Sequence, residues 1–441
     1  MERVFILDLG RCTGCQACRI ACALENGPEP AAAWRTVLTF NEPNLPGMPR
    51  FHLSLACNHC RAAPCMEQCP ARAFRRDEAT GALVLDGSRC LGCRYCSWVC
   101  PFDAPRYDVR ARVMSKCTLC LPRLSAGLLP ACVSLCPTGA LAYGEPPAGA
   151  AEAVPGFPRT DFAPAIRFVP LREGNRGPEC SAAQPADSGA AVPAAAPARA
   201  SLKKEWPLAI FSLGSAVLAA LVAAAAARGL RLDPAAFLVA GSANLLVGTL
   251  HLGRKLRAWR ALLNLRRSRL SREVVLYLLF LALAALAAGA APPGPAWRWA
   301  AAAAGGAMLY AVDRIYDPVA ASRYLHSAGM LWTGVFLTGA LLVDAALVGV
   351  VGGTRLVLYV GRKAAFLRRG LPLRPLAAAL RLGFPAMWLL LPPGGTWLPL
   401  ACLLAGELVD RLEYYAELEP PAPRRRVDAD LRALARAQGL T

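Results

Sequence analysis

Histidine is scarce in this chain, which has four among 441 residues. Two of them, His251 and His326, lie in the apolar second half of the sequence. A membrane domain with two bis-histidine haems would need four membrane histidines. We therefore expect no haem in this part of the chain.

A recognisable export signal is also lacking. The apolar stretch within the first ten residues is too short for a signal peptide, and no twin-arginine pair precedes Cys12. Disulfides persist mainly in oxidising compartments, which exported proteins reach through such a signal. The sequence therefore favours metal ligation over disulfides for its many cysteines.

Acidic side chains are few compared with basic ones, 30 against 49, which gives a formal net charge of +19. The polar half contains no basic helix with interleaved aromatic residues, so no nucleic-acid partner is expected. In a polytopic membrane protein, a basic excess typically reflects Lys and Arg in the loops on one membrane face.

The chain is very apolar, with 55% hydrophobic residues and a mean hydropathy of +0.36. These values are too high for an ordinary soluble enzyme of this length. Residues 1–200 mix Cys, Pro, Arg and acidic residues, whereas residues 206–415 are dominated by Leu, Ala, Val and Gly. The composition therefore indicates a polar domain followed by one in lipid.

Sixteen of the eighteen cysteines form four runs in the polar domain. The runs are Cys12, Cys15, Cys18, Cys22; Cys57, Cys60, Cys65, Cys69; Cys90, Cys93, Cys96, Cys100; and Cys117, Cys120, Cys132, Cys136. The first and third have the spacing Cys-x2-Cys-x2-Cys-x3-Cys, and a proline follows each of the last three runs. This is the pattern of bacterial ferredoxins.

The spacing has a physical reason. Two intervening residues let the backbone turn tightly enough to place three thiolates on neighbouring corners of one cubane. The fourth cysteine comes three residues later, points away and ligates another cluster. Four such runs supply sixteen ligands, enough for four [4Fe–4S] clusters.

Structural zinc sites with four cysteines are the alternative, because they also use Cys-x2-Cys pairs. Zinc motifs do not normally add a third cysteine two residues later and then a Cys-Pro pair. The longer gaps after Cys60 and Cys120 look like loop insertions within ferredoxin units. The spacing therefore favours iron–sulfur clusters.

The region after the cysteine runs has a different character. Residues 146–200 are rich in Ala, Pro and Gly and are expected to form a flexible linker. Apolar segments of about 20 residues, enough to cross a bilayer, then follow. The candidate spans are Trp206–Ala227, Pro234–Leu252, Glu273–Ala291, Trp297–Tyr316, Met330–Val351, Pro375–Leu391 and Thr396–Tyr415, with a weaker one at Thr354–Leu367.

The predicted fold is an α+β ferredoxin-like, four-cluster head followed by an all-α polytopic membrane domain of seven or eight helices. We divide the chain into the head (1–145), the linker (146–200), the transmembrane anchor (201–418) and a polar C-terminal tail (419–441). The weak span carries Arg362 and Lys363, so it is expected to skim the membrane surface or to form the eighth helix.

Several single residues leave two readings open. His59 is either a hydrogen-bond donor to a cluster sulfur or an ordinary surface histidine. Asp344, in the middle of an apolar segment, either serves a proton path or pairs with a neighbouring helix. Tyr95 and Trp98 are expected to shield a cluster by packing. Cys180 and Cys402 have no partner spacing and receive no ligand role; Cys402 is expected to be a small buried residue.

The head resembles the iron–sulfur subunit of the dimethyl sulfoxide reductase family. The motifs that carry the resemblance are Arg11-Cys12-Thr13-Gly14-Cys15, Cys57-Asn58-His59-Cys60, Cys90-Leu91-Gly92-Cys93-Arg94-Tyr95-Cys96, Lys116-Cys117 and Cys136-Pro137. In that family, runs one and four exchange their last cysteines, as do runs two and three. The resemblance thus implies that Cys12, Cys15 and Cys18 join Cys136, and that Cys117, Cys120 and Cys132 join Cys22. It likewise implies that Cys57, Cys60 and Cys65 join Cys100, and that Cys90, Cys93 and Cys96 join Cys69.

The apolar part resembles the anchor subunit of the same family. Its landmarks are Glu205-Trp206-Pro207-Leu208, His251-Leu252-Gly253, Ser271-Arg272-Glu273 and Ala405-Gly406-Glu407-Leu408. The resemblance implies a quinol site at His251, Arg257 and Glu273. A neutral imidazole and a carboxylate can accept hydroxyl protons, and a guanidinium can steady the semiquinone or orient the carboxylate. Without the family, His251 reads as an interfacial residue.

The loop charges predict which side the head faces. The loop after the second span carries eight basic residues: Arg254, Lys255, Arg257, Arg260, Arg266, Arg267, Arg269 and Arg272. The loops and edges of the other side carry Arg228, Arg231, Arg298 and Arg355. The positive-inside rule then places the head in the cytoplasm and the anchor in a bacterial-type inner membrane. Family members with an exported catalytic subunit would place the head outside.

The resulting functional prediction is a redox conduit. Electrons pass from the quinone pool through four clusters to a separate molybdopterin-containing catalytic subunit that reduces a small molecule. The sequence also allows the reverse flow, from a partner dehydrogenase to quinone. A third possibility is a non-redox membrane scaffold stabilised by zinc.

Overall fold

The computed structural model describes residues 3–27, 34–171, 202–289, 294–319, 326–368, 374–390 and 398–439. The chain divides into two compact units. The head consists of residues 1–198 and 420–441, and the helical unit of residues 199–419. Each unit is described by itself below.

The head is built on a small sheet with the strand order β8-β1-β9. β1 (Val4–Asp8) pairs antiparallel with β8 (Leu141–Gly144) and parallel with β9 (Ile166–Val169). Val4, Phe5 and Leu7 of β1 are buried, as expected for the central strand of a sheet that packs on a core.

Three hairpins and five short helices complete the cysteine-rich part of the head. The hairpins are β2 (Thr36–Phe40) with β3 (Phe51–Leu55), β4 (Phe74–Arg76) with β5 (Leu83–Leu85), and β6 (Arg106–Asp108) with β7 (Val113–Ser115). The helices are α1 (Ala17–Asn26), α2 (Pro64–Glu67), α3 (Tyr95–Val99), α4 (Leu121–Ser125) and α5 (Ala131–Ser134). This confirms the α+β ferredoxin-like fold class.

The linker begins later than predicted. Residues 146–171 are folded onto the head, because β9 joins the main sheet and Ala151 bridges Phe168. The expectation of an unstructured segment from residue 146 is therefore wrong for these residues. The alternation of Ile166 and Phe168, both buried, is the strand signal that the Ala/Pro-rich composition obscured. The rest of the predicted linker, with Cys180, lies outside the described residues.

The C-terminal residues form a helix of the head. α14 (Pro423–Ala437) buries Val427, Leu431 and Ala435, which lie on one helix face at a spacing of four residues. It packs against β2, and the Asp430 carboxylate accepts a hydrogen bond from the backbone N–H of Gly156 at 2.8 Å. The polar tail thus returns to the head after the helical unit.

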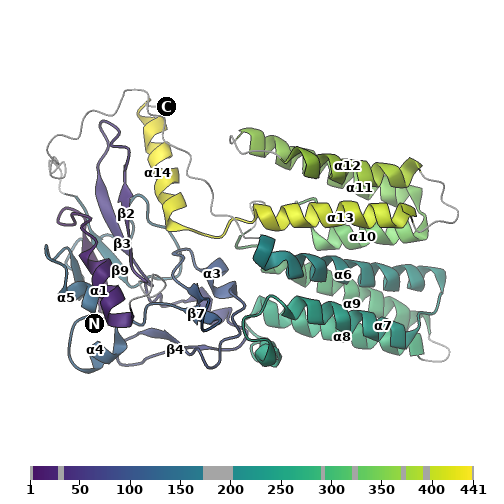
Figure 1. Ribbon diagram of the computed structural model, residues 1–441, viewed down its shortest axis with the longest axis horizontal. Coiled ribbons are helices and arrows are strands. Elements are labelled where there is room, and N and C mark those ends of the chain that lie inside the picture. Colours follow the sequence, from purple (N-terminus) through teal and green to yellow (C-terminus); the bar gives the residue numbers. More distant parts are fainter. Residues whose placement is uncertain are drawn as a thin grey trace. The chain divides into compact units, whose positions relative to one another are not determined.

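The helical unit contains eight described α-helices and one 3-10 helix (Figure 1). They are α6 (Leu202–Arg228), α7 (Pro234–Thr249), η1 (Lys255–Leu262), α8 (Arg269–Gly289), α9 (Pro295–Ile315), α10 (Met330–Leu342), α11 (Ala345–Arg368), α12 (Pro375–Leu390) and α13 (Leu398–Glu417). α6 is central, because it packs against α7, α9, α10 and α13.

Several of these helices are candidates for membrane spans. By length and composition, three described helices suit a crossing: Glu205–Arg228, Arg269–Gly289 and Ala345–Arg368. α7 and α10 are apolar but shorter. The helical second part with several candidate membrane helices is therefore as predicted.

The boundary between the fifth and sixth spans differs from the prediction. α10 ends at Leu342 because Val343 adopts a left-handed conformation, with φ 55°. Asp344 then caps α11, its carboxylate accepting a hydrogen bond from the backbone N–H of Leu347 at 2.9 Å. Asp344 therefore lies between two helices. The expectation that it lies in the middle of a span is wrong, and residues 345–351 belong to the next helix.

Candidate cluster and quinol sites

The four cysteine runs share one loop conformation. In each Cys-x-x-Cys loop the residue before the second cysteine has a positive φ: Gly14 (70°), His59 (45°), Gly92 (70°) and Leu119 (63°). This conformation turns the backbone N–H of the same residue toward the first thiol. The N–Sγ distances are 3.5 Å from His59 to Cys57, 3.4 Å from Gly92 to Cys90 and 3.4 Å from Leu119 to Cys117. Such N–H donors stabilise negative charge on sulfur.

Runs one and four bring their cysteines together across the sequence. Burial raises the pKa of Cys12, and the thiols that raise it further are Cys18, Cys136 and Cys15. Burial likewise raises the pKa of Cys120, with Cys132 and Cys22 as the neighbouring thiols. Each set therefore combines three cysteines of one run with the last cysteine of the other.

Runs two and three are arranged in the same way. Burial raises the pKa of Cys60 to about 12, and the neighbouring thiols Cys57 and Cys100 add to the effect. Burial raises the pKa of Cys93 to about 12, and its neighbours are Cys69 and Cys90. We name the four sets by their first member. They are the Cys12 group (Cys12, Cys15, Cys18, Cys136), the Cys117 group (Cys117, Cys120, Cys132, Cys22), the Cys57 group (Cys57, Cys60, Cys65, Cys100) and the Cys90 group (Cys90, Cys93, Cys96, Cys69).

The four groups follow one another in a line. Cys117 has Cys57 among its electrostatic neighbours, which joins the Cys117 group to the Cys57 group. Cys96 has Cys65 among its neighbours, which joins the Cys90 group to the Cys57 group. Buried Arg35 interacts with Cys18 of the Cys12 group and with Cys22 of the Cys117 group. The order along the line is therefore the Cys12 group, the Cys117 group, the Cys57 group and the Cys90 group.

Two of the groups line cavities. One cavity is lined by all four thiols of the Cys117 group. A second is lined by all four thiols of the Cys57 group. In both, four thiols from two runs face one shared space, which is the arrangement that a cluster with four thiolate ligands requires.

The donor chemistry fits iron–sulfur clusters. All described cysteines are free thiols. Within the described ranges, no set of three or more His, Cys, Asp or Glu side chains is close enough together to hold a single metal ion. Buried thiols that raise one another's pKa become thiolates readily only when a bound metal supplies positive charge. A cubane would supply that charge and spread its ligands over four corners.

Burial of the residues around the thiols excludes one of the two readings of His59. His59 is 4% exposed, so it is not a surface histidine. Its Nδ1 accepts a hydrogen bond from the backbone N–H of Leu83 at 2.9 Å, which leaves the proton on Nε2. Tyr95 and Trp98 are buried and pack edge to face, with ring centroids 6.4 Å apart. Cys402, also buried, lies in α13, away from the four runs in the sequence.

The predicted quinol residues lie around the connection between α7 and α8. His251 follows α7, Arg257 lies in η1, and Glu273 is in the second turn of α8. The Nδ1 of His251 donates to the backbone carbonyl of Gly248, so Nε2 of the neutral ring is an acceptor. Glu273 is 6% exposed, and its electrostatic neighbour is Arg411 of α13.

Arg411 and the tyrosines around it were not expected from the sequence. The Arg411 side chain is 3% exposed and donates to the Ser212 hydroxyl at 2.8 Å. Its guanidinium lies against the rings of Tyr414, Tyr415 and Tyr316, at 5.0, 5.4 and 6.0 Å from their centroids. An arginine within an apolar segment was the signal available in the sequence.

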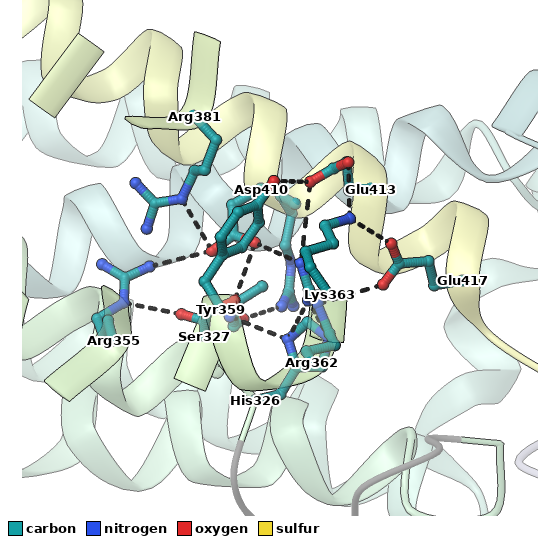
Figure 2. A network of polar contacts seen from close by, with 12 residues as sticks. His326, Ser327, Arg355, Tyr359, Arg362, Lys363, Arg381, Asp410, Glu413 and Glu417 are labelled. Carbon is teal, nitrogen blue, oxygen red and sulfur yellow. Dashed lines mark hydrogen bonds and ion pairs between the residues drawn. The ribbon is translucent and has the colours of Figure 1, made fainter. Parts of the chain in front are cut away.

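A second buried polar network lies between α11, α12 and α13, and Figure 2 shows its side chains converging. Arg355, 1% exposed, holds the Glu407 carboxylate with two bonds of 2.9 and 2.5 Å. Lys363 contacts Glu413 and Glu417 at 2.8 and 2.7 Å. The cations of the network are Arg355, Arg362, Lys363 and Arg381, and the anions are Glu407, Asp410, Glu413 and Glu417.

The structure bears on two expectations. The segment with Arg362 and Lys363 is part of the 24-residue helix α11, whose length and composition suit a membrane crossing, in agreement with the alternative of an eighth helix. The other expectation is corrected. Arg355 lies within this helix and not at a loop edge. Because four cations face four carboxylates, the charges balance, which is how charged groups are accommodated inside a bundle.

Comparison with known proteins places these features in a family. Residues 49–146 match a 4Fe-4S dicluster domain, and residues 235–291 match the DMSO reductase anchor subunit. The second match includes His251, Arg257 and Glu273.

Whole proteins similar to the head include an electron-transfer subunit. Thiosulfate reductase electron transfer subunit PhsB of Salmonella typhi is 41% identical over 147 residues, which are 33% of this chain and 76% of the relative. A component of the anaerobic dimethyl sulfoxide reductase of Escherichia coli is 36% identical over 148 residues, 32% of this chain and 72% of the relative. A component of the tetrathionate reductase of Salmonella typhimurium is 41% identical over 144 residues, 32% of this chain, and the match covers 56% of that relative's length.

The cysteine groups, the helical unit and these likenesses agree with one another. The chain belongs to the iron–sulfur electron-transfer subunits of the dimethyl sulfoxide reductase family, and it carries that family's membrane anchor fused behind the iron–sulfur head.

Proposed function

We propose that this chain takes electrons from quinol in the membrane and passes them through four [4Fe–4S] clusters to a separate molybdopterin-containing catalytic subunit. That subunit would reduce an oxidised small molecule. The chain itself is then a conduit, and the substrate chemistry occurs elsewhere.

The linear order of the four thiol groups is the observation that carries the proposal. Each group offers four thiols drawn from two runs, and neighbouring groups share electrostatic contacts. Four cubanes ligated in this way would give an electron a stepwise path along the head. A bound cluster supplies one-electron redox chemistry, while the protein places the thiolates and donates N–H groups to their sulfurs.

We assign His251, Arg257 and Glu273 of the helical unit to the quinol. The Nε2 of His251 and the Glu273 carboxylate are the acceptors for the two hydroxyl protons. Arg257 orients the bound ring or its carboxylate partner.

Metal and sulfide analysis of the full chain tests the cofactor assignment. Four cubanes require about sixteen irons and as many labile sulfides per chain after anaerobic purification. Stoichiometric zinc without sulfide would instead establish the scaffold alternative. A molybdopterin subunit that co-purifies with the chain would identify the partner.

The direction of electron flow needs a separate measurement. Reduction potentials of such clusters range from about −700 to +450 mV, so the ligand set does not fix the direction. We expect a redox titration followed by electron paramagnetic resonance to give at least one cluster near or above the menaquinone couple. Four potentials well below that couple would favour flow from a partner dehydrogenase to quinone.

A further inference from the structure

Two cations are buried in the head without a carboxylate partner. Arg35 and Lys116 are each 2% exposed. Among the described residues of the head, neither forms an ion pair with Asp or Glu. Lys and Arg are almost never fully buried unless they are paired, so these two positions need an explanation.

Arg35 lies between the Cys12 group and the Cys117 group. Its Nη1 donates to the carbonyl oxygen and the hydroxyl of Ser54, at 3.0 and 3.2 Å, and its guanidinium lies 4.7 Å from the Phe5 ring centroid. Its electrostatic neighbours in the two groups are Cys18, Cys22, Cys117 and Cys132. The Ser54 contacts therefore hold the charge at the first junction of the line.

Lys116 lies at the next junction. Its Nζ donates to the carbonyl oxygens of Leu83 and Cys117, the second at 2.7 Å. It interacts electrostatically with Cys65 of the Cys57 group and with Cys117 of the neighbouring group. Both hydrogen bonds go to neutral carbonyls, so the charge of Lys116 is left to act on the thiols of both groups.

We propose that Arg35 and Lys116 are the counter-ions of the clusters on either side of them, and that each raises the reduction potentials of the two clusters that it separates. This inference rests on the proposed function, because it requires clusters at the four groups. The two residues are positioning and tuning residues; neither is a cluster ligand.

The physical argument is electrostatic. A cluster gains one negative charge on reduction, and a fixed positive charge nearby stabilises the reduced form more than the oxidised form. The interaction is stronger inside a protein than in water, because the dielectric response is weaker and mobile ions are excluded. Net charge and hydrogen bonds near the sulfurs are known to set cluster potentials. The thiolates and the reduced clusters in turn compensate the two buried cations.

The placement also makes the effect selective. Arg35 acts on the Cys12 and Cys117 groups, and Lys116 on the Cys117 and Cys57 groups. The Cys90 group lies at the end of the line, beyond the Cys57 group. Removing one cation should therefore move two potentials and leave that of the Cys90 group nearly unchanged.

The test is a potentiometric titration of the anaerobically purified full chain, followed by electron paramagnetic resonance. The neutral variants are Lys116→Met and Arg35→Met, and the charge-retaining variants are Lys116→Arg and Arg35→Lys. Arg424→Gln removes an exposed head cation of α14, which pairs with Glu42, and serves as the control. We expect each neutral variant to shift two cluster signals to lower potential. The charge-retaining variants should restore most of the shift, and the control should leave all signals in place.

Iron and sulfide contents separate the possible failures. Variants with wild-type iron and unshifted potentials would overturn the inference while leaving the proposed function intact. Wild-type protein without iron or sulfide would overturn both. If Lys116→Met loses iron, Lys116→Gln keeps a donor for the two carbonyls, and equal potentials in Lys116→Gln and Lys116→Arg would refute a role for the charge.

Discussion

At the scale of single residues, the backbone conformation of the cysteine loops is as important as the thiols. A left-handed residue before the second cysteine directs an N–H toward the first sulfur in each run. Gly14 has a further constraint, because a Cβ there would lie 2.7 Å from the His52 ring. Two of the four loops use glycine, and the other two accept the strain of His59 and Leu119.

Gly14→Ala should therefore destabilise the head more than an equivalent change elsewhere. The left-handed backbone costs a non-glycine residue about 1–2 kcal/mol, and overpacking against His52 adds about 1–3 kcal/mol. Gly81→Ala is the matched control, since Gly81 has φ +71° but nothing within 4 Å of the added Cβ. Thermal unfolding and iron content of the two variants provide the measurement. Equal losses of stability would contradict the role of His52.

Glu273→Gln tests the proposed quinol site. An amide cannot take the hydroxyl proton, so reduction of the clusters by a quinol should slow by about a hundredfold or more, as is usual when a general base is lost. Reduction by dithionite should remain as in the wild type, because it does not use the membrane site. Unchanged quinol oxidation would remove Glu273 from the proposed site.

The cysteines could be identified from the sequence, but the cations that interact with the candidate cluster and quinol residues could not. Cys-x-x-Cys spacing is local, so the four runs can be read directly. Arg35 meets Cys117 and Cys132 only through the fold, and Arg411 meets Glu273 across two helices. No periodicity along the chain encodes these contacts, and they become visible only in three dimensions.

At the scale of the helices, α11 shows how hydropathy alone misplaces an element. Apolar residues on both sides of Asp344 read as one continuous span, whereas left-handed Val343 ends α10 and Asp344 caps α11. Valine is a rare residue for that conformation, so the break could hardly be predicted from the local sequence. Arg362 and Lys363 made this segment a weak candidate for a membrane span. Both side chains pair with carboxylates of α13.

Arg355→Met should cost the helical unit about 3–5 kcal/mol, because it leaves a buried carboxylate network with one cation too few. The double variant Arg355→Met/Glu407→Gln should recover a large part of that loss. Arg368→Gln, at an exposed position of the same helix, should change stability by less than about 0.5 kcal/mol. Unfolding in detergent compares these variants with the single variant Glu407→Gln. A double variant whose loss of stability equals the sum of the losses of its two single variants would refute direct coupling.

At the scale of the whole molecule, the fold class and the division into head and anchor followed from composition and cysteine spacing. The return of the tail to the head did not, since an amphipathic helix of fifteen residues does not reveal what it packs against. The start of the linker was misjudged because alanine and proline dominate residues 146–171.

The orientation of the anchor is a testable property of the whole chain. The basic residues around η1 predict a cytoplasmic head, and the burial of Arg355 removes one cation from the opposite side. Protease added to inverted membrane vesicles should therefore digest the head. Protection of the head in those vesicles, with digestion in right-side-out ones, would reverse the orientation.

The helix α14 makes the anchor an insertion within the head and not an appendage behind it. A soluble fragment that stops at residue 171 would leave the hydrophobic face of β2, and the N–H of Gly156, open to water. Joining residues 420–441 to that fragment through a short spacer would keep the pairing with Asp430. A water-soluble version of the electron-transfer part is therefore best obtained by excision of the middle of the gene and not by truncation.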